Sequence, residues 1–286
     1  MPKADKNTPG RITHPEKVLF PDDGITKGEL AAYYDLVTDV MLPHLRGRPI
    51  TMERFPSGID KKGFLQKDVV KGFPEWLKRV EAPKKGGTVH YAVADDQRSL
   101  QWLANQNTIT MHVWPSRAPH IERPDVCVFD LDPSRDEPEV LRDTALALRD
   151  LLLEHDVKSW VKTSGSKGFH IVTRLAPKAT FGESSHFADL VANILVQRKP
   201  KQLTLEFSKA DRKGRILIDT GRNRQGATFA AAYTVRAKPG APVSAPCTWE
   251  EVERGDAQPQ TFTLRSMPAR LAKVGDLWKD LIKRQT

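Results

Sequence analysis

The stretch from Val126 to Pro133 reads VCVFDLDP, in which an apolar run leads into Asp130 and Asp132 and then stops at a proline. Its nearly continuous apolar character predicts a strand that is buried on both faces, as in the middle of a sheet. Side chains two residues apart in a strand point to the same face, so we expect Asp130 and Asp132 side by side at the strand end. Two carboxylates placed there repel each other and need a proton, a cation or a surface location.

Helices and further strands are predicted on both sides of this stretch. Apolar residues recur at helical spacing over residues 28–45, 134–156, 183–199 and 276–284. Strands are predicted at residues 48–55 and 214–220, a short helix turning into a strand at 100–114, and a hairpin at 159–175, whereas residues 58–80 are expected to be loop with short elements. Because hairpins interleave with helices, the fold class is mixed α/β or α+β and not a purely parallel sheet.

The composition predicts a globular protein. The chain has 286 residues, of which 39% are hydrophobic, enough for one large domain or two small ones. Residues 1–10 contain two prolines and two lysines without apolar periodicity, which predicts a disordered tail. No proline- or glycine-rich linker divides the remainder, so we expect residues 11–286 to form a single domain.

The sequence also excludes several classes of protein. No apolar run approaches the roughly 20 residues that span a bilayer, and the start of the chain lacks the apolar block of a secretory signal. We therefore expect a cytoplasmic, nucleoid-associated protein without a membrane partner. Cys127 and Cys247 lie far apart and have no neighbours at zinc-site spacing, which argues against a disulfide framework and a structural zinc.

Positive charge is concentrated in one segment, residues 197–224, called the basic segment below. The formal net charge of the chain is +9, and this segment holds nine Lys or Arg against three acids, an excess of six. Such a concentration is typical of proteins that bind an anionic polymer. A solvated surface gives the same pattern, so charge alone leaves both interpretations open.

A third carboxylate, Asp219, ends the apolar segment GRILIDT inside the basic segment. Strand ends of a sheet often gather at one cleft, and three carboxylates there can hold two divalent ions for an in-line displacement at phosphorus. Taken alone, a short pattern such as Asp130 and Asp132 more often marks surface acids, one of them capping the next helix. Asp219 and the neighbouring arginines favour a phosphoryl-transfer centre.

The segment SGSKGFH, residues 164–170, adds a turn suited to an anion. Its glycines let backbone N–H groups approach an anion, and Ser164, Ser166 and Lys167 add donors. The spacing is not that of a Walker loop, and a flexible hairpin tip is the alternative. His170 and His112 each lie in a predicted strand, where a lone histidine is commonly a satisfied polar residue.

Taken in order, these motifs resemble those of archaeo-eukaryotic primase-type polymerases. More narrowly, the chain is similar to the polymerase domain of bacterial ligase D and its stand-alone relatives, which act in double-strand-break repair by end joining. The likeness rests on THPEKVLFPDDGITKGEL from Thr13, RFPSG, GFLQKD, MHVWPSR, VFDLDP, SGSKGFH, ILIDTGRN and YTVRAKPGAPVS, and so covers nearly all of the chain. It implies a compact α/β (α+β) fold with a central, mostly antiparallel sheet flanked by helices, beside a smaller second lobe.

The resemblance also implies roles for individual residues. The catalytic, metal-binding carboxylates would be Asp130, Asp132 and Asp219. The triphosphate and sugar of the nucleotide would be bound by His112, Ser164, Ser166, Lys167, His170 and Arg236. DNA would be bound by His14, Lys17 and Lys27, in a pocket for a downstream 5′-phosphate, and by Arg54 and Phe64 along the template and primer strands.

Three positions depart from the pattern of that family. His14 stands where Asn is frequent, Glu53 stands where a basic residue is frequent, and Leu65 replaces the second aromatic residue of a Phe-Phe pair. Loss of a stacking side chain costs roughly 1–3 kcal/mol per base contacted. The departures therefore predict an altered DNA preference and not a loss of catalysis.

The function implied is template-dependent addition of NTPs, ribonucleotides preferentially, to primer 3′ ends by two-metal catalysis with Mn²⁺ or Mg²⁺. The setting would be gap filling or end processing in break repair. Expected partners are gapped or broken DNA, NTPs or dNTPs, bacterial Ku, and a separate DNA ligase because the chain lacks a Lys-x-Asp-Gly motif. The alternatives are a metal-dependent nuclease and a non-catalytic scaffold that binds DNA ends.

Overall fold

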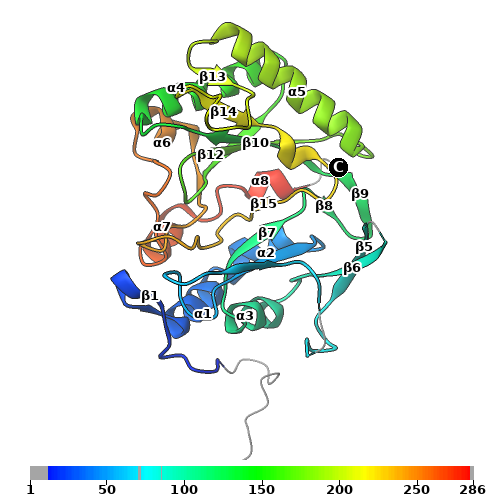
Figure 1. The fold of residues 1–286 in the computed structure, drawn as a ribbon, viewed down its shortest axis with the longest axis vertical. Helices are drawn as coiled ribbons and strands as arrows, with labels where there is room; N and C mark the ends of the chain where they lie inside the picture. The colour runs from blue at the N-terminus through cyan, green and yellow to red at the C-terminus, as the bar shows by residue number, and fades with distance from the viewer. Residues whose placement is uncertain (1–11, 70–71, 85, 284–286) are drawn as a thin grey trace, which may run out of the picture.

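Two six-stranded sheets lie one above the other in the computed structural model, which describes residues 12–69, 72–84 and 86–283 (Figure 1). The first, called the carboxylate sheet below, has the strand order β13-β14-β10-β12-β11-β16. The second, called the companion sheet, has the order β15-β7-β3-β6-β5, and β4 pairs with β3. Apart from the parallel pair β13–β14, the neighbouring strands of both sheets are antiparallel.

The strands have the following bounds. The carboxylate sheet contains β10 (Val126–Asp132), β11 (Ser159–Thr163), β12 (Phe169–Arg174), β13 (Leu203–Thr204), β14 (Ile216–Asp219) and β16 (Pro246–Cys247). The companion sheet contains β3 (Ile50–Arg54), β4 (Phe64–Gln66), β5 (Arg79–Lys84), β6 (Gly87–Ala92), β7 (Thr108–Val113) and β15 (Phe229–Ala230). Two smaller ribbons pair β1 (Val18–Phe20) with β2 (Ile25–Thr26), and β8 (Ser116–Arg117) with β9 (His120–Pro124).

Helices cover the outer side of each sheet (Figure 1). On the carboxylate sheet these are α4 (Pro138–Leu153) and α5 (Phe181–Arg198), and on the companion sheet α1 (Lys27–Leu36) and α3 (Gln97–Asn105). Helix α2 (Thr38–Leu45) contacts α1, α3 and α8 (Lys279–Ile282). The remaining helices are α6 (Trp249–Arg254), α7 (Met267–Val274) and the 3₁₀ turns η1 (Pro21–Asp23) and η2 (Gly221–Asn223). None of the helices in the described ranges is long and apolar enough to cross a membrane.

Strand β10 is buried on both faces, as its composition predicted. Phe129 points to the outer side, where its ring lies 6.2 Å from that of Phe187 on α5. Val126 and Val128 alternate with it and face the companion sheet, and so, by the same alternation, does Asp130. Val128 lies outside the part of β10 that pairs with β14. There the side chain of Asn223 takes the place of a partner strand: its Oδ1 accepts the N–H of Val128 and its Nδ2 donates to the C=O of Val128, each at 2.8 Å. Asn223 thus satisfies the backbone of β10 at Val128, just before the acids at the end of the strand.

A charged cluster lies between the two sheets beside α8. Arg48 is 4% exposed, and its Nη2 lies 2.7 Å from Oδ1 of Asp125, while Nε of Arg117 lies 2.7 Å from Oδ2. These side chains line the same small cavity as Leu281 of α8. Burial alone would raise the pKa of Asp125, but the two guanidinium groups outweigh it and hold that pKa below its ordinary value.

The predicted fold class is confirmed, and the local predictions hold with shifted boundaries. The helix expected at 28–45 is two helices that meet at Val37, where Thr38 Oγ1 donates to the backbone carbonyl of Tyr34 and competes with the helical ladder. The helix expected from residue 134 begins at Pro138, because the fixed φ of proline suits a first helical turn. The hairpin β5–β6 was not predicted, since Pro83 and Gly87 interrupt its strand pattern. The predicted tail, residues 1–10, lies outside the described residues.

Candidate active site

Four side chains from four strands form one row across the carboxylate sheet. Asp219 of β14 lies opposite Asp130 of β10, Asp130 lies opposite His170 of β12, and His170 lies opposite Lys162 of β11. Directly opposed residues place their Cβ atoms about 4.5–5.5 Å apart on one face. Asp132 follows Asp130 by two residues and shares that face, which is turned toward the companion sheet. The three acids of the sequence motifs are thus brought together at one edge of the sheet interior.

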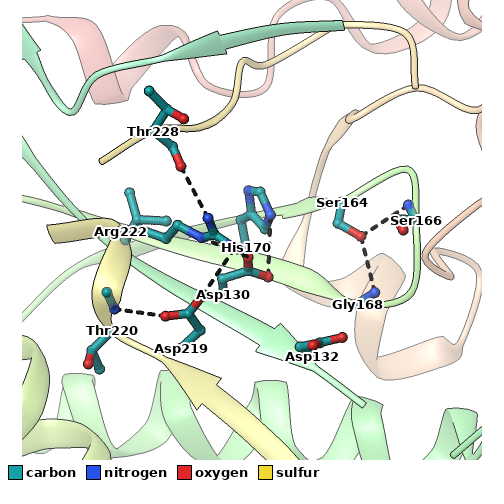
Figure 2. A network of polar contacts seen from close by, with 12 residues as sticks. Asp130, Asp132, Ser164, Ser166, Gly168, His170, Asp219, Thr220, Arg222 and Thr228 are labelled. Carbon is teal, nitrogen blue, oxygen red and sulfur yellow. Dashed lines mark hydrogen bonds and ion pairs between the residues drawn. The ribbon is translucent and has the colours of Figure 1, made fainter. Parts of the chain in front are cut away.

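Arg222 lies between two of these acids, as Figure 2 shows. Its Nη2 is 3.1 Å from Oδ2 of Asp130 and 3.1 Å from Oδ2 of Asp219. The 3₁₀ turn η2, which follows β14 directly, positions the arginine, and the N–H of Gly221 donates to Oδ1 of Asp219 at 2.8 Å. One guanidinium therefore serves as the shared counter-ion of two opposed carboxylates.

Asp132 has its own arginine. Nη1 of Arg212, a residue only 3% exposed, lies 2.8 Å from Oδ2 of Asp132. The same guanidinium donates to the backbone carbonyls of Glu206 and Phe207, at 3.1 and 3.0 Å. Asp132 is not the cap of the helix that follows, because the N-cap of α4 is Glu137 and makes no side-chain capping bond. The capping alternative for this acid pair is therefore wrong.

The carboxylates suit a divalent cation by their chemistry. Burial, opposed by Arg222 and reinforced by the charges of Asp219 and Asp132, raises the pKa of Asp130 above its ordinary value, so its charged form carries a desolvation cost that a bound cation would offset. Carboxylate oxygens are the ligands that Mg²⁺ and Mn²⁺ prefer. Within residues 12–69, 72–84 and 86–283, no three acidic, His or Cys side chains converge as they stand on a single ion position. At this site, oxygens of all three carboxylates lie within ion-pair distance of Arg222 or Arg212.

The turn between β11 and β12 packs tightly on the acid strand and is not a loose hairpin tip. A Cβ added to Gly168 would lie 1.7 Å from the carbonyl oxygen of Leu131, so only glycine fits at that position. Oγ of Ser164 accepts the backbone N–H groups of Ser166 and Gly168, both at 3.1 Å (Figure 2). Two N–H groups that the sequence assigned to an anion are therefore used inside the turn. The exposed ammonium group of Lys167 lies at its tip.

Residues near the companion sheet complete the site from the opposite side. His112 of β7 shares a 2.9 Å hydrogen bond with Oε2 of Glu53 on β3. Burial, partly offset by Glu53, lowers the pKa of His112. Nη1 of Arg236 donates to the backbone carbonyl of Ser164 at 2.6 Å. Nε of Arg236 is buried and has no hydrogen-bond acceptor within the described part of the chain. Glu53, noted above as a departure from the family pattern, is thus the partner of a predicted nucleotide ligand.

Several residues of the site were not identified from the sequence. Lys162 lies next to His170, with Nζ 2.8 Å from Nδ1, and Nε2 of His170 lies 3.5 Å from Oδ1 of Asp130. Arg212 and Arg222 were counted only as part of the basic segment. Two signals were present in the sequence: Lys162 is the one charged residue in the strand segment SWVKT, and Arg222 follows Asp219 by one helical turn.

The predicted 5′-phosphate pocket lies at the start of α1. The backbone N–H of Lys27 donates to the carbonyl of Lys17 at 2.7 Å, so the two lysines are neighbours. Nζ of Lys17 donates to the carbonyl of Pro56, and Nζ of Lys27, a residue 3% exposed, donates to the carbonyl of Thr13 at 2.7 Å. His14 is the most open of the three, with a side chain 80% exposed.

The two other predicted DNA contacts form a pair on the hairpin of β3 and β4. The guanidinium carbon of Arg54 lies 5.4 Å from the ring centre of Phe64, and Nε of Arg54 donates to the carbonyl of Gln106 at 2.8 Å. Phe64 is 46% exposed and Leu65 is 61% exposed. Large apolar side chains that remain this exposed on a basic hairpin suit contact with bases.

The basic segment is only partly available to a polyanion. Arg212 and Arg222 hold the acids of the site, and Arg198 forms a two-pronged ion pair with Glu154. The basic residues of this segment that remain exposed include Lys201, Lys209, Lys213 and Arg224.

Comparison with known proteins gives consistent matches. The family model described as "LigD, primase-polymerase domain" matches residues 26–278. The multifunctional non-homologous end joining protein LigD of Mycolicibacterium smegmatis is 35% identical over 272 residues, which are 93% of this chain and 35% of the relative. The bifunctional LigD of Bacillus subtilis is 30% identical, over 93% of this chain and 43% of its own length. The chain thus spans about a third of the length of such relatives.

A solved structure has the same fold. The polymerase domain from Mycobacterium tuberculosis ligase D in complex with DNA superimposes with a TM-score of 0.90 and 32% sequence identity. The match covers 95% of this chain and 97% of that one.

Proposed function

The chain belongs to the LigD primase-polymerase domain family, and we propose that it adds nucleotides to the 3′ end of a primer strand on a DNA template. The resemblance inferred from the ordered motifs is confirmed. The predicted enzyme class, a DNA-directed nucleotidyltransferase, is confirmed at the level of the family.

The observation that carries the proposal is the meeting of acids and phosphate-binding groups between the two sheets. Asp130 and Asp219 lie opposite each other, and Asp132 shares their face. Two arginines interact electrostatically with Asp130. The charge of Arg222 lowers the pKa of Asp130 against the effect of burial, and the charge of Asp130 raises the pKa of Arg236 against the effect of burial. Acids that suit a metal beside arginines that suit phosphate are the combination that phosphoryl transfer needs.

Asp130, Asp132 and Asp219 would hold divalent ions, either Mn²⁺ or Mg²⁺. When bound, a pair of such ions polarises the attacking 3′-hydroxyl and neutralises charge on the phosphates. Arg222 and Arg212 would then exchange carboxylate oxygens for phosphate oxygens, which a guanidinium group also binds in a two-pronged manner.

The nucleotide would be bound by the turn at Ser164–Lys167 and by the groups around it. Lys167 and Arg236 would neutralise charge that develops on the triphosphate, Lys167 from the exposed tip and Arg236 through its unused Nε–H. His112, His170, Ser164 and Ser166 complete the set that we assign to the triphosphate and sugar. Burial and the surrounding cations lower the pKa of His170 well below its ordinary value, so this imidazole acts as a neutral hydrogen-bonding group.

DNA would be bound at two places. His14, Lys17 and Lys27 would bind a downstream 5′-phosphate, for which Lys27 would exchange its bonds to Thr13. Arg54 and Phe64 would contact the template and primer strands.

The wider setting follows the names of the relatives, which are end-joining proteins. We propose gap filling or end processing in break repair, with a preference for ribonucleotides, and cooperation with a separate DNA ligase and with bacterial Ku. We also propose that the protein works in the cytoplasm at the nucleoid.

Extension of a labelled primer on a gapped duplex tests the proposal. NTPs and dNTPs are compared in Mn²⁺ and in Mg²⁺, with and without a downstream 5′-phosphate. We expect lengthening that requires a divalent ion and is strengthened by the 5′-phosphate. Asp130→Ala should abolish extension and retain DNA binding, whereas Asp136→Ala, a change of an exposed acid just beyond the site, should retain both. Full extension by Asp130→Ala would refute the metal assignment. Shortening of the primer would identify a nuclease, and binding without either reaction would identify a scaffold.

A further inference from the structure

Lys162 is a fully buried lysine to which the proposed reaction gives no role. It is 0% exposed in the middle of β11, and lysines are almost never fully buried unless they are paired. Its Nζ lies 2.8 Å from Nδ1 of His170 and is hydrogen-bonded to Oγ of Ser244. Both partners are neutral groups, so this lysine is not held by direct contact with a carboxylate. A side chain placed at such cost needs an explanation in what it does for its partners.

The direction of the hydrogen bonds at Ser244 is fixed by the backbone. Oγ of Ser244 lies 3.0 Å from the carbonyl oxygen of Thr163. A carbonyl oxygen can only accept, so the hydroxyl of Ser244 donates its one proton there and presents a lone pair to Lys162. Lys162 is therefore a donor toward Ser244. Burial and the charge of Arg236 lower the pKa of Lys162 well below its ordinary value, but the amine keeps at least two N–H groups in either charge state. After the bond to Ser244, a second N–H therefore remains for Nδ1 of His170.

The other side of the imidazole leads to the same assignment. Nε2 of His170 faces Oδ1 of Asp130 at 3.5 Å. An ionised carboxylate only accepts, and a lone pair on Nε2 would face the lone pairs of that oxygen. The single proton of a neutral imidazole therefore lies on Nε2, where it points to the carboxylates, and Nδ1 is left as the acceptor for Lys162. The register that places Lys162, His170 and Asp130 directly opposite one another makes this alignment a property of the sheet itself.

We propose that Lys162 is a positioning residue, which donates to Nδ1 of His170 and thereby fixes the imidazole as the Nε2–H tautomer, with its N–H directed at the acid side of the site. The assignment of the recipient in the working protein, a phosphate oxygen of the nucleotide, rests on the proposed function. The tautomer does not, because it follows from contacts within the chain. Burial and the neighbouring cations, Lys162 among them, lower the pKa of His170, in agreement with a neutral ring.

Nuclear magnetic resonance of the full chain labelled with ¹⁵N-histidine tests the proposal without nucleotide or DNA. Two-bond ¹H–¹⁵N correlations distinguish protonated from unprotonated ring nitrogens, and His170→Gln identifies the signals of residue 170. In the unchanged protein we expect a protonated Nε2 and an Nδ1 with the shift of a strong hydrogen-bond acceptor. In Lys162→Met, which preserves the length and loses the donor, the Nδ1 shift should move to that of a nitrogen without a bond. Lys158→Met, an exposed lysine four residues earlier on the same strand segment, should leave both signals in place.

A protonated Nδ1 in the unchanged protein would overturn the proposal, and that result requires no variant to fold. An unmoved Nδ1 signal in a folded Lys162→Met would overturn it as well. If Lys162→Met does not fold, Lys162→Gln retains a donor of shorter reach, and the Nδ1 shift of His170 should lie between that of the unchanged protein and that of a nitrogen without a bond. An unmoved Nδ1 signal in folded Lys162→Gln would overturn the proposal.

Kinetics separate positioning from a general loss of structure. With Lys162→Met we expect the KM for NTP to rise about tenfold, the effect of one hydrogen bond to a charged group. The KM for primer-template should not change, since the hydrogen bonds of Lys162 go to His170 and Ser244 and to none of the predicted DNA contacts. Equal losses for both substrates would indicate damage to the fold. Because the spectra require no catalysis, a wrong tautomer with intact extension refutes this inference alone, and the right tautomer without extension refutes the proposed function alone.

Discussion

Replacing Arg222 with glutamine removes the cation that Asp130 and Asp219 share. The two carboxylates then face each other across β10 and β14 without a counter-ion. We expect the metal-free variant to be less stable than the unchanged protein. We also expect a divalent ion to stabilise the variant more, because the ion no longer has to displace a guanidinium group.

The size of the effect follows from the geometry. Arg222 attracts both carboxylates, and two opposite unit charges about 4 Å apart interact with about 4 kcal/mol at the effective dielectric constant of about 20 that suits pairs near a surface. Arg222 is 39% exposed, whereas the acid side chains are 16% and 12% exposed, so screening is partial and a loss of about 2–3 kcal/mol is expected. For a chain of this size that corresponds to a Tm lower by roughly 5 °C. An ion at 100 times its Kd returns about 2.7 kcal/mol, which restores most of the loss.

Thermal unfolding in EDTA, in Mg²⁺ and in Mn²⁺ measures both terms. Arg224→Gln is the matched control, because it removes the same charge two residues away at an exposed position. For Arg222→Gln we expect a lower Tm in EDTA and a larger rise in Tm on addition of a divalent ion than in the unchanged protein. For Arg224→Gln we expect the Tm in EDTA and the rise with the ion to match those of the unchanged protein. If the two variants lose the same stability in EDTA and gain the same from Mn²⁺, then Arg222 is not the resident counter-ion of these acids.

Three further changes test other parts of the structure. Gly168→Ala places a Cβ 1.7 Å from the carbonyl of Leu131 and should cost about 3 kcal/mol of unfolding free energy in urea, whereas Gly182→Ala in α5, with its nearest neighbour 3.8 Å away, should add about 0.5–1 kcal/mol. Asp125→Asn should be destabilising at neutral pH. Because the pKa of Asp125 in the folded protein lies below its ordinary 3.8, the ion pairs of Asp125 stabilise the fold above pH 3.8 and are lost as the pH falls through the folded pKa. The difference in stability between the variant and the unchanged protein should therefore disappear in acid. Phe64→Ala should weaken binding of single-stranded template by about 1–3 kcal/mol without a change in Tm, as measured by fluorescence anisotropy, since its ring is 46% exposed.

The acid strand could be predicted from the sequence because its information is local. Six residues, Val126 to Leu131, with Asp130 as the one polar interruption favour burial on both faces, and the period of two places Asp130 and Asp132 together without reference to any other segment. The gathering of Asp219 with them required more, namely that two apolar strands ending in acids become neighbours. Here the ordered motifs compensated for the missing pairing information, since their resemblance to a known family carries the topology with it.

The arginines of the site could not be assigned because pairing in the sheet is not local. Strand β10 lies between β12 and β14, whose residues follow it by about 40 and 90 positions. Nothing in the composition of the basic segment separates Arg212 and Arg222, which hold the acids, from Lys209 and Lys213, which remain exposed. A count of positive charge is blind to this difference, because it depends on which side chain the third dimension places within about 3 Å of a carboxylate.

Lys162 shows where the information in a sequence ends. A hairpin centred on Ser166 pairs residue 162 with residue 170, so the contact between this lysine and His170 follows from the turn motif alone. Its burial does not, because alternation in SWVKT is compatible with a lysine that points to solvent. The cover comes from β16 and from Ser244, more than 80 residues later in the chain, and the carbonyl of Thr163, through Ser244, makes Lys162 a donor at that end of the row. The pairing of Lys162 with His170 is therefore encoded locally. The burial that keeps the imidazole of His170 neutral, with one protonated ring nitrogen, is encoded in part by the distant segment that covers the pair.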